Sequence, residues 1–71
     1  MDLTKRETQI LQHFANGDST REVAKKLNLS YYTIKQHRVR IRHRLGAKTF
    51  AQAIAIALDE DIIEGTDAWT T

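Results

Sequence analysis

The residues most able to do chemistry are nine basic side chains gathered in the middle of the chain. They lie between residues 21 and 48, a stretch that contains a single acidic residue, Glu22. They are Arg21, Lys25, Lys26, Lys35, Arg38, Arg40, Arg42, Arg44 and Lys48. The residues after position 48 include five acidic and no basic side chains. A positive block of this kind predicts binding of a polyanion; the alternative is a solvated helical face.

The sequence gives little support for a catalytic site or a metal-binding site. The two histidines of the basic block, His37 and His43, are six residues apart, whereas zinc-binding helices space theirs by about four so that both share one face. His13 adds no further partner. Ser19 and Ser30 have no histidine at reactive spacing and are better explained as helix caps. We therefore expect no enzyme, no metal and no cofactor.

The length and composition describe one small domain. The chain has 71 residues, 41% of them hydrophobic, with no Cys and no Pro. A chain of this size buries only about 60% of its unfolded surface, so a partner subunit would help its core. Because no charged stretch followed by an apolar one opens the sequence, we expect no signal segment. No apolar run approaches the roughly 20 residues that span a bilayer. We expect a cytoplasmic, nucleoid-associated protein without a membrane partner.

Helix-start patterns divide the chain into four parts. Thr4–Glu7, Ser19–Glu22 and Thr49–Gln52 each match a capping box, in which a hydroxyl and a carboxyl or amide cap the same turn. Ser30 is a further N-cap candidate. These signals predict helices over 5–15, 20–27, 31–45 and 50–60. No alternating run rich in Val, Ile or Thr supports a strand, so the expected fold class is all-α.

The apolar residues of the first three predicted helices recur at helical spacing. They are Ile10, Leu11 and Phe14, then Val23, Ala24 and Leu27, then Ile34, Ile41 and Leu45. Only Asn28 and Leu29 lie between the second helix and the N-cap of the third. The Leu29 side chain can fill the space where the two helices meet. Two short helices joined by so tight a turn, with the basic residues on the second, predict a helix-turn-helix.

A series of short motifs runs in register from residue 3 to residue 63. They are Leu3-Thr4 with Arg6-Glu7, Gly17, Ser19 with Glu22-Val23-Ala24 and Leu27, Ser30, Thr33-Ile34-Lys35, His37, Ile41, Leu45-Gly46 and Ala53-Ile54. Their order and spacing resemble the LuxR-type (GerE-like, NarL/FixJ group) DNA-binding domain. The resemblance implies a four-helix fold with a three-helix core plus a C-terminal dimerisation helix, and transcription regulation in a bacterium or its phage. We expect a stand-alone chain whose activity is controlled by something outside the chain. The alternative is that the sequence is the output domain of a longer regulator.

The third predicted helix turns one face away from the core. Counting from Ile34, the sector opposite the core holds Tyr32, Gln36, Val39, Arg40 and His43, with Lys35 on its flank. The resemblance implies that Lys35, Gln36 and Val39 enter the major groove of double-stranded DNA. A glutamine can pair with adenine, a lysine can reach guanine or a phosphate, and a valine can pack on a thymine methyl group.

Phosphate contacts are expected around this face, where they position the protein without reading sequence. The candidates are hydroxyl and basic residues, namely Ser19, Thr20, Arg21, Tyr32, Thr33, Arg40, His43, Arg44 and Lys48. Thr33 has an alternative role in the first turn of its own helix. For His37 we expect a packed, hydrogen-bonded ring at the edge of the core.

Three positions depart from the family pattern. Arg38 and Arg42 stand where the family commonly has apolar residues, and Phe50 stands where it often has a basic one. We expect the arginine stems to cover apolar surface while their guanidinium groups reach outward. They would then add charge beside the DNA-facing surface or bind an acidic partner.

The helix predicted over 50–60 is apolar nearly all round. One stripe, formed by Phe50, Ala53, Ile54, Ala57 and Leu58, can close the core. The other face holds Ala51, Gln52, Ala55, Ile56 and Asp59. A helix that is apolar on both sides is buried on both, so we expect a homodimer through this face, where the resemblance also places dimerisation. The alternative is an Ala-rich helix with one exposed Ile56.

The domain is expected to span 1–63, with Ile62 and Ile63 turning back to seal the core, followed by an acidic tail over 64–71. Three alternatives remain open for Trp69 in this tail: it docks onto the domain, it contacts a partner, or it makes no contact. A competing function is a protein-interaction module that binds and sequesters larger LuxR-type regulators or another cellular target.

Overall fold

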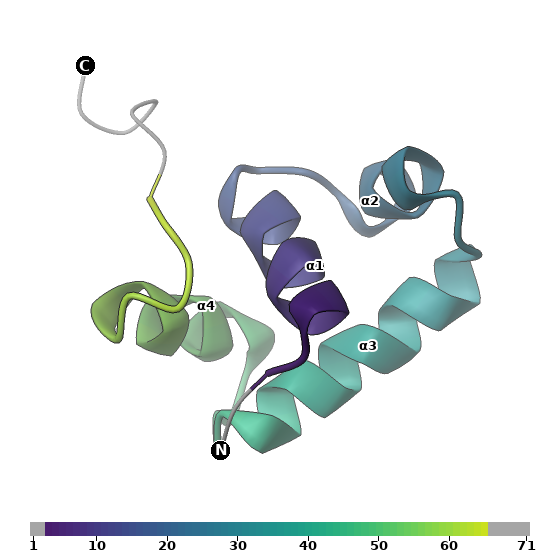
Figure 1. Ribbon diagram of the computed structural model, residues 1–71. Helices are drawn as coiled ribbons and strands as arrows, with labels where there is room; N and C mark the ends of the chain where they lie inside the picture. Colours follow the sequence, from purple (N-terminus) through teal and green to yellow (C-terminus); the bar gives the residue numbers. More distant parts are fainter. Residues whose placement is uncertain (1–2, 66–71) are drawn as a thin grey trace.

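Four helices form the fold, and the computed structural model describes residues 3–65 (Figure 1). They are α1 (Lys5–Ala15), α2 (Thr20–Leu27), α3 (Tyr31–Arg44) and α4 (Phe50–Asp59). No strand occurs within this range. The predicted all-α class is confirmed, and α3 and α4 each end one residue earlier than expected, because Leu45 and Glu60 are their C-caps.

Polar caps start each helix, largely as the sequence predicts. Thr4 and Ser19 form complete capping boxes with Glu7 and Glu22. The third expected box is different. Thr49 Oγ1 accepts from the amide of Gln52, but the Gln52 side chain accepts from the amide of Lys48, at 2.6 Å, rather than from that of Thr49. The amide side chain therefore stabilises the turn one residue before the expected position.

A left-handed residue makes the corner between α2 and α3 tight. Asn28, the C-cap of α2, has φ 56° and ψ 44°, a conformation that asparagine tolerates better than most residues. The amide of Leu29 then donates to the carbonyl of Ala24, at 2.9 Å. Gly17 and Gly46 also have positive φ, of 101° and 67°, as expected at the ends of α1 and α3. The short turn fixes how α3 leaves α2.

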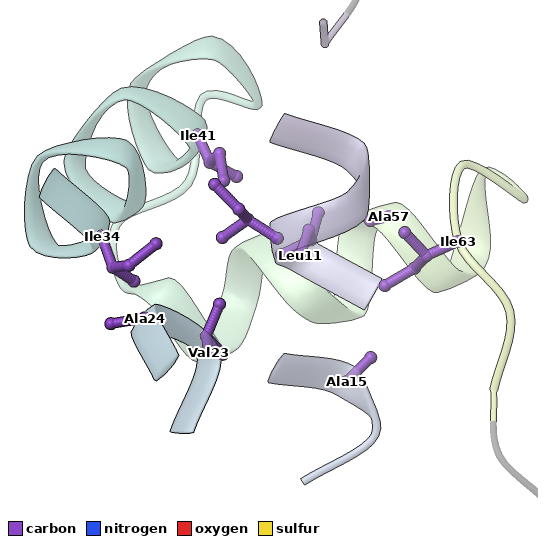
Figure 2. Close-up of a cluster of buried hydrophobic side chains, with 9 residues drawn as sticks. Leu11, Ala15, Val23, Ala24, Ile34, Ile41, Ala57 and Ile63 are labelled. Carbon is purple, nitrogen blue, oxygen red and sulfur yellow. The ribbon is translucent and has the colours of Figure 1, made fainter. Parts of the chain in front are cut away.

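The core is built from all four helices. Ile10, Leu11, Val23, Ile34 and Ile41 are fully buried. Figure 2 shows side chains of α1, α2 and α3 converging, with Ala57 of α4 and Ile63 completing the cluster. Both α1 and α3 contact each of the other helices, while α2 and α4 lie on opposite sides of α1. The core therefore holds α3 along one side with its other face uncovered.

The segment after α4 returns to the core. Ile63 is buried and Ile62 packs beside the cluster, as predicted. Leu58 differs, since 37% of it is exposed although it was assigned to the core stripe. Glu64 pairs with α1 through two bonds: its amide donates to Gln12 Oε1, at 2.8 Å, and its carbonyl accepts from Gln12 Nε2, at 2.7 Å. Trp69 and the rest of 66–71 lie outside the described residues, and the domain boundary at residue 63 stays a prediction.

Two carboxylates tie the helices together. Glu7, almost fully buried, caps α1 and lies 3.4 Å from Nε of Arg44 at the end of α3. Asp18 lies 2.9 Å from Lys26 Nζ and 3.0 Å from His13 Nδ1. The hydrogen bond from Lys26 holds the pKa of Asp18 below its ordinary value, and the bond with His13 acts in the same direction. Lys26 is therefore partly neutralised within the fold.

Candidate nucleic-acid interface

The uncovered side of α3 carries the predicted base-reading residues. Lys35 and Gln36 are exposed, and 47% of Val39 is accessible, although Ile34 and Ile41 on the same helix are fully buried. This division follows from helical periodicity, because a stripe that faces the core leaves the residues between its members facing outward. The three side chains form one exposed patch of mixed donor, acceptor and apolar character.

Tyr31 contacts two basic residues, Lys35 within this patch and Arg21 outside it. The guanidinium carbon of Arg21 lies 5.4 Å from the centroid of its ring, and Nζ of Lys35 lies 5.6 Å from the same centroid. Cations at such distances are attracted by the ring quadrupole. Tyr31 was not among the residues predicted for the interface. Its spacing of four from Lys35 could have suggested the pair, but nothing in the sequence indicated Arg21.

The predicted phosphate-binding hydroxyls also serve the helix starts. Ser19 Oγ accepts from the amide of Glu22, at 3.1 Å, and Thr20 Oγ1 accepts from Arg38, at 2.9 Å. Ser30 Oγ donates to Thr33 Oγ1, at 2.8 Å, so Thr33 does take part in the first turn of α3. An accepting hydroxyl keeps its own hydrogen for donation. Ser19, Thr20 and Thr33 therefore retain the capacity to bind a phosphate oxygen.

Arg38 does not reach outward, contrary to the expectation from the sequence. Its guanidinium carbon lies 4.5 Å from the ring centroid of Phe50 and 5.1 Å from that of Phe14, and Nη1 donates to Thr20 Oγ1. The two rings pack edge to face, with centroids 5.0 Å apart. The aromatic surface and the hydroxyl together attract the planar cation inward. Arg38 thus joins the starts of α2 and α4 to the middle of α3.

Arg42 is also held at the surface of the fold. Its Nη1 donates to the carbonyl of Ala47, at 3.1 Å, and its Nη2 lies 3.2 Å from Nε2 of His43. The bond to Ala47 stabilises the turn that follows α3. The remaining basic candidates for phosphate contact, Arg40, His43 and Lys48, are exposed, as is Arg44, which is paired with Glu7.

His37 differs in part from its prediction. It is half-buried, as expected for a ring at the core edge, but its Nδ1 atom is buried without a hydrogen-bond partner. Among residues 3–65, no group of three His, Cys, Asp or Glu side chains is arranged to hold a metal ion. In the same range, no helix is both long and apolar enough to traverse a bilayer.

The outer face of α4 is exposed. Ala51, Gln52, Ala55 and Asp59 are accessible, Ile56 is half-buried, and Ala53 and Ala57 on the opposite side are fully buried. Four of the five residues predicted for dimerisation therefore lie openly on one surface, and Ile56 lies at its margin. Gln52 has the additional capping role described above.

Comparison with known proteins identifies the family to which this chain belongs. Residues 1–57 match the model of the bacterial regulatory proteins of the luxR family (GerE). The chain belongs to the LuxR family. The LuxR-type resemblance found in the sequence is confirmed, and the family is one of regulatory proteins rather than an enzyme class.

LuxR-family relatives and solved structures agree with this assignment. The chain is 35% identical over 63 residues to the Fimbriae Z protein of Salmonella typhimurium and 36% identical over 62 residues to the oxygen regulatory protein NreC of Staphylococcus aureus. These matches cover 89% and 87% of the chain but only 30% and 29% of the relatives. The chain thus spans less than a third of their length.

Two solved structures superpose closely. The transcription factor GerE matches with a TM-score of 0.83 and 29% identity, covering 87% of this chain and 92% of GerE. VqmA of Vibrio cholera, solved in a complex with ligand and DNA, matches with a TM-score of 0.82 and 27% identity, covering 87% of this chain and 27% of VqmA. The four-helix LuxR-type helix-turn-helix fold is therefore established for this chain.

Proposed function

We propose that the protein is a homodimeric regulator of transcription that binds specific sites in double-stranded DNA. It acts in the bacterial cytoplasm, on the nucleoid, either for the bacterium or for its phage. The observation that carries the proposal is the exposed patch of Lys35, Gln36 and Val39 on the uncovered face of α3. That patch offers a glutamine for adenine, a cation for guanine and a methyl-bearing side chain for thymine.

The surroundings of the patch support DNA as the partner. The exposed basic residues and the hydroxyls at the starts of α2 and α3 suit phosphate, which supplies affinity without sequence information. VqmA, a structural neighbour, was solved with DNA bound. Similarity to regulators in the family supports the same conclusion. The corresponding function here is to bring α3 into the major groove, as recognition helices do.

A two-fold dimer through α4 would set two recognition helices about 34 Å apart, which favours a near-palindromic site. The small side chains of Ala51 and Ala55 permit two such helices to approach closely, with Ile56 as the apolar contact. In sedimentation experiments we expect the wild type to be a dimer and Ile56→Glu to be a monomer. Lys5→Glu, a change of charge on α1, serves as the control and should remain dimeric.

The direct test is selection of the purified protein against random double-stranded DNA, followed by sequencing. An enriched inverted repeat with half-sites about one helical turn apart is expected. Lys35→Ala and Gln36→Ala should each weaken binding to the selected site by roughly 1–3 kcal/mol. Unchanged binding by both variants would contradict the proposed use of α3. No retained DNA at all would favour the competing function, capture of a larger regulator.

A further inference from the structure

A surface hollow lies between α3 and the start of α4. It has a volume of about 300 Å³ and is lined by Lys35, Arg38, Val39, Arg42 and Phe50. The four residues from α3 follow one another at helical spacing and so form a single stripe. Lys35 and Val39 also belong to the exposed base-reading patch. The hollow therefore adjoins that patch directly, on the side towards α4.

The hollow concentrates positive charge. Lys35 and Arg38 are three residues apart and Arg38 and Arg42 are four apart, spacings at which like charges destabilise a helix. Within residues 3–65, the ion pairs formed by carboxylates involve none of these three cations. The repulsion among them is thus uncompensated by acidic groups, and an anion placed in the hollow would relieve it.

The start of α4 borders the hollow, and the side chain of Arg38 connects the hollow to the start of α2. Arg38 donates to Thr20, the first residue of α2, and lies over Phe50, the first residue of α4. The N-terminal end of a helix carries a partial positive charge, so both starts add to the field of the cations. Through Arg38 the hollow is thereby connected to Thr20, one of the hydroxyl residues expected to bind phosphate.

We infer that this hollow binds the sugar–phosphate backbone of the DNA whose bases α3 reads. Arg42 and Lys35 neutralise a phosphate, while a deoxyribose packs against Val39 and Phe50. The inference rests on the proposed DNA-binding function and adds Arg42 and Phe50 to its contacts. A small metabolite is a poorer occupant, because the hollow is open and only at the lower limit of about 300–1,000 Å³ seen for ligand pockets. DNA is favoured over an acidic peptide because Lys35 and Val39 also belong to the patch that we propose reads the bases.

The test compares Arg42→Gln with Arg6→Gln, which removes the same charge from the exposed surface of α1. Binding to a duplex is measured between about 50 and 200 mM salt. We expect Arg42→Gln to lower the slope of log affinity against log salt by about one per subunit of the dimer and the affinity about fivefold per subunit near physiological salt, with site preference unchanged. Arg42→Lys should restore the slope, and Arg6→Gln should leave it as in the wild type. Urea unfolding shows whether each variant is folded, because Arg42 also bonds Ala47.

A second measurement uses the wild type alone and follows the Nε–Hε NMR signals of Arg38 and Arg42. Both should shift when the duplex is added. A normal salt slope in Arg42→Gln with unmoved arginine signals in DNA-bound wild type would overturn the inference while leaving the proposed function intact. If no duplex binds the wild type, both fail together. Signals that move with a Glu-rich peptide but not with the duplex would show that the hollow takes an acidic partner instead.

Discussion

Arg38 of α3 lies over the ring of Phe50 at the start of α4, with its guanidinium carbon 4.5 Å from the ring centroid. The same group reaches Thr20 of α2 and the ring of Phe14 of α1. One side chain therefore contacts all three of the other helices. It achieves this with a charge-assisted hydrogen bond and cation–π contacts, where an apolar residue would offer packing alone.

Replacing Arg38 should weaken the fold. Arg38→Met keeps the apolar stem but loses the bond to Thr20 and the attraction to both rings, and we expect a loss of about 1–2 kcal/mol in the free energy of unfolding. Urea unfolding measures this loss. In the Arg38→Met background, Thr20→Val should cost less than it does in the wild type, because the shared bond is already gone. Fully additive losses would show that the bond contributes nothing.

Replacing Tyr31 should weaken DNA binding without changing the fold. Tyr31→Ala releases Arg21 and Lys35 from the ring, so these side chains must be ordered when DNA binds. An ordering cost of about 1 kcal/mol corresponds to about fivefold lower affinity. Tyr31→Phe retains the ring and should bind like the wild type. Titration of labelled duplex with each variant makes the measurement. Equal weakening by both substitutions would instead assign the effect to the phenol hydroxyl.

The pH dependence of stability should report on Asp18. Its pKa is lowered in the folded state, chiefly by the hydrogen bond from Lys26. Its stabilising contribution is therefore fully present above the unfolded value of about 3.9 and is lost as the pH falls through the folded pKa. Asp18→Asn should be less stable than the wild type above about pH 4, with the difference shrinking in more acidic solution.

Urea unfolding at a series of pH values checks this expectation. Lys26→Met removes the main cause of the lowered pKa and should flatten the acid dependence in the same way, although Asp18 itself is retained. A constant difference between the wild type and Asp18→Asn down to the lowest pH would mean that the ion pair does not control the pKa.

Replacing Gln12 should release the segment that follows α4. Gln12→Ala removes both bonds to Glu64, and we expect a loss of about 1 kcal/mol in stability. The amide of Glu64 should also exchange with solvent much faster, which hydrogen-exchange NMR detects. Asn16→Ala is the matched control, since it removes only the bond between Asn16 and the Gln12 side chain. Unchanged exchange at Glu64 in Gln12→Ala would contradict the assigned role.

Local signals in the sequence predicted the helices well. Caps and glycines act within one turn, so Thr4, Ser19 and Gly46 could be assigned from their neighbours alone. The exposed face of α3 could also be predicted from the sequence, because the burial of Ile34 and Ile41 determines where Gln36 must point. These features depend on residues at most one or two turns apart.

Two sets of contacts that the sequence did not predict join residues that are distant in the chain. The inward position of Arg38 depends on Phe14 and Thr20, and the pairing of Gln12 with Glu64 spans 52 residues. Helical periodicity says nothing about which helices meet, so it could not supply these partners. For the same reason, the hollow beside α3 could not be foreseen, since Phe50 reaches it from another helix.

Glu7 gives the fold a mechanical property. One of its carboxylate oxygens accepts from the amide of Thr4, at 3.0 Å, and the other lies 3.4 Å from Nε of Arg44. The point where the chain enters α1 is thereby linked to the last turn of α3. A displacement of Arg44 at the end of α3 would therefore be passed, through one side chain, to the residue that caps the start of α1.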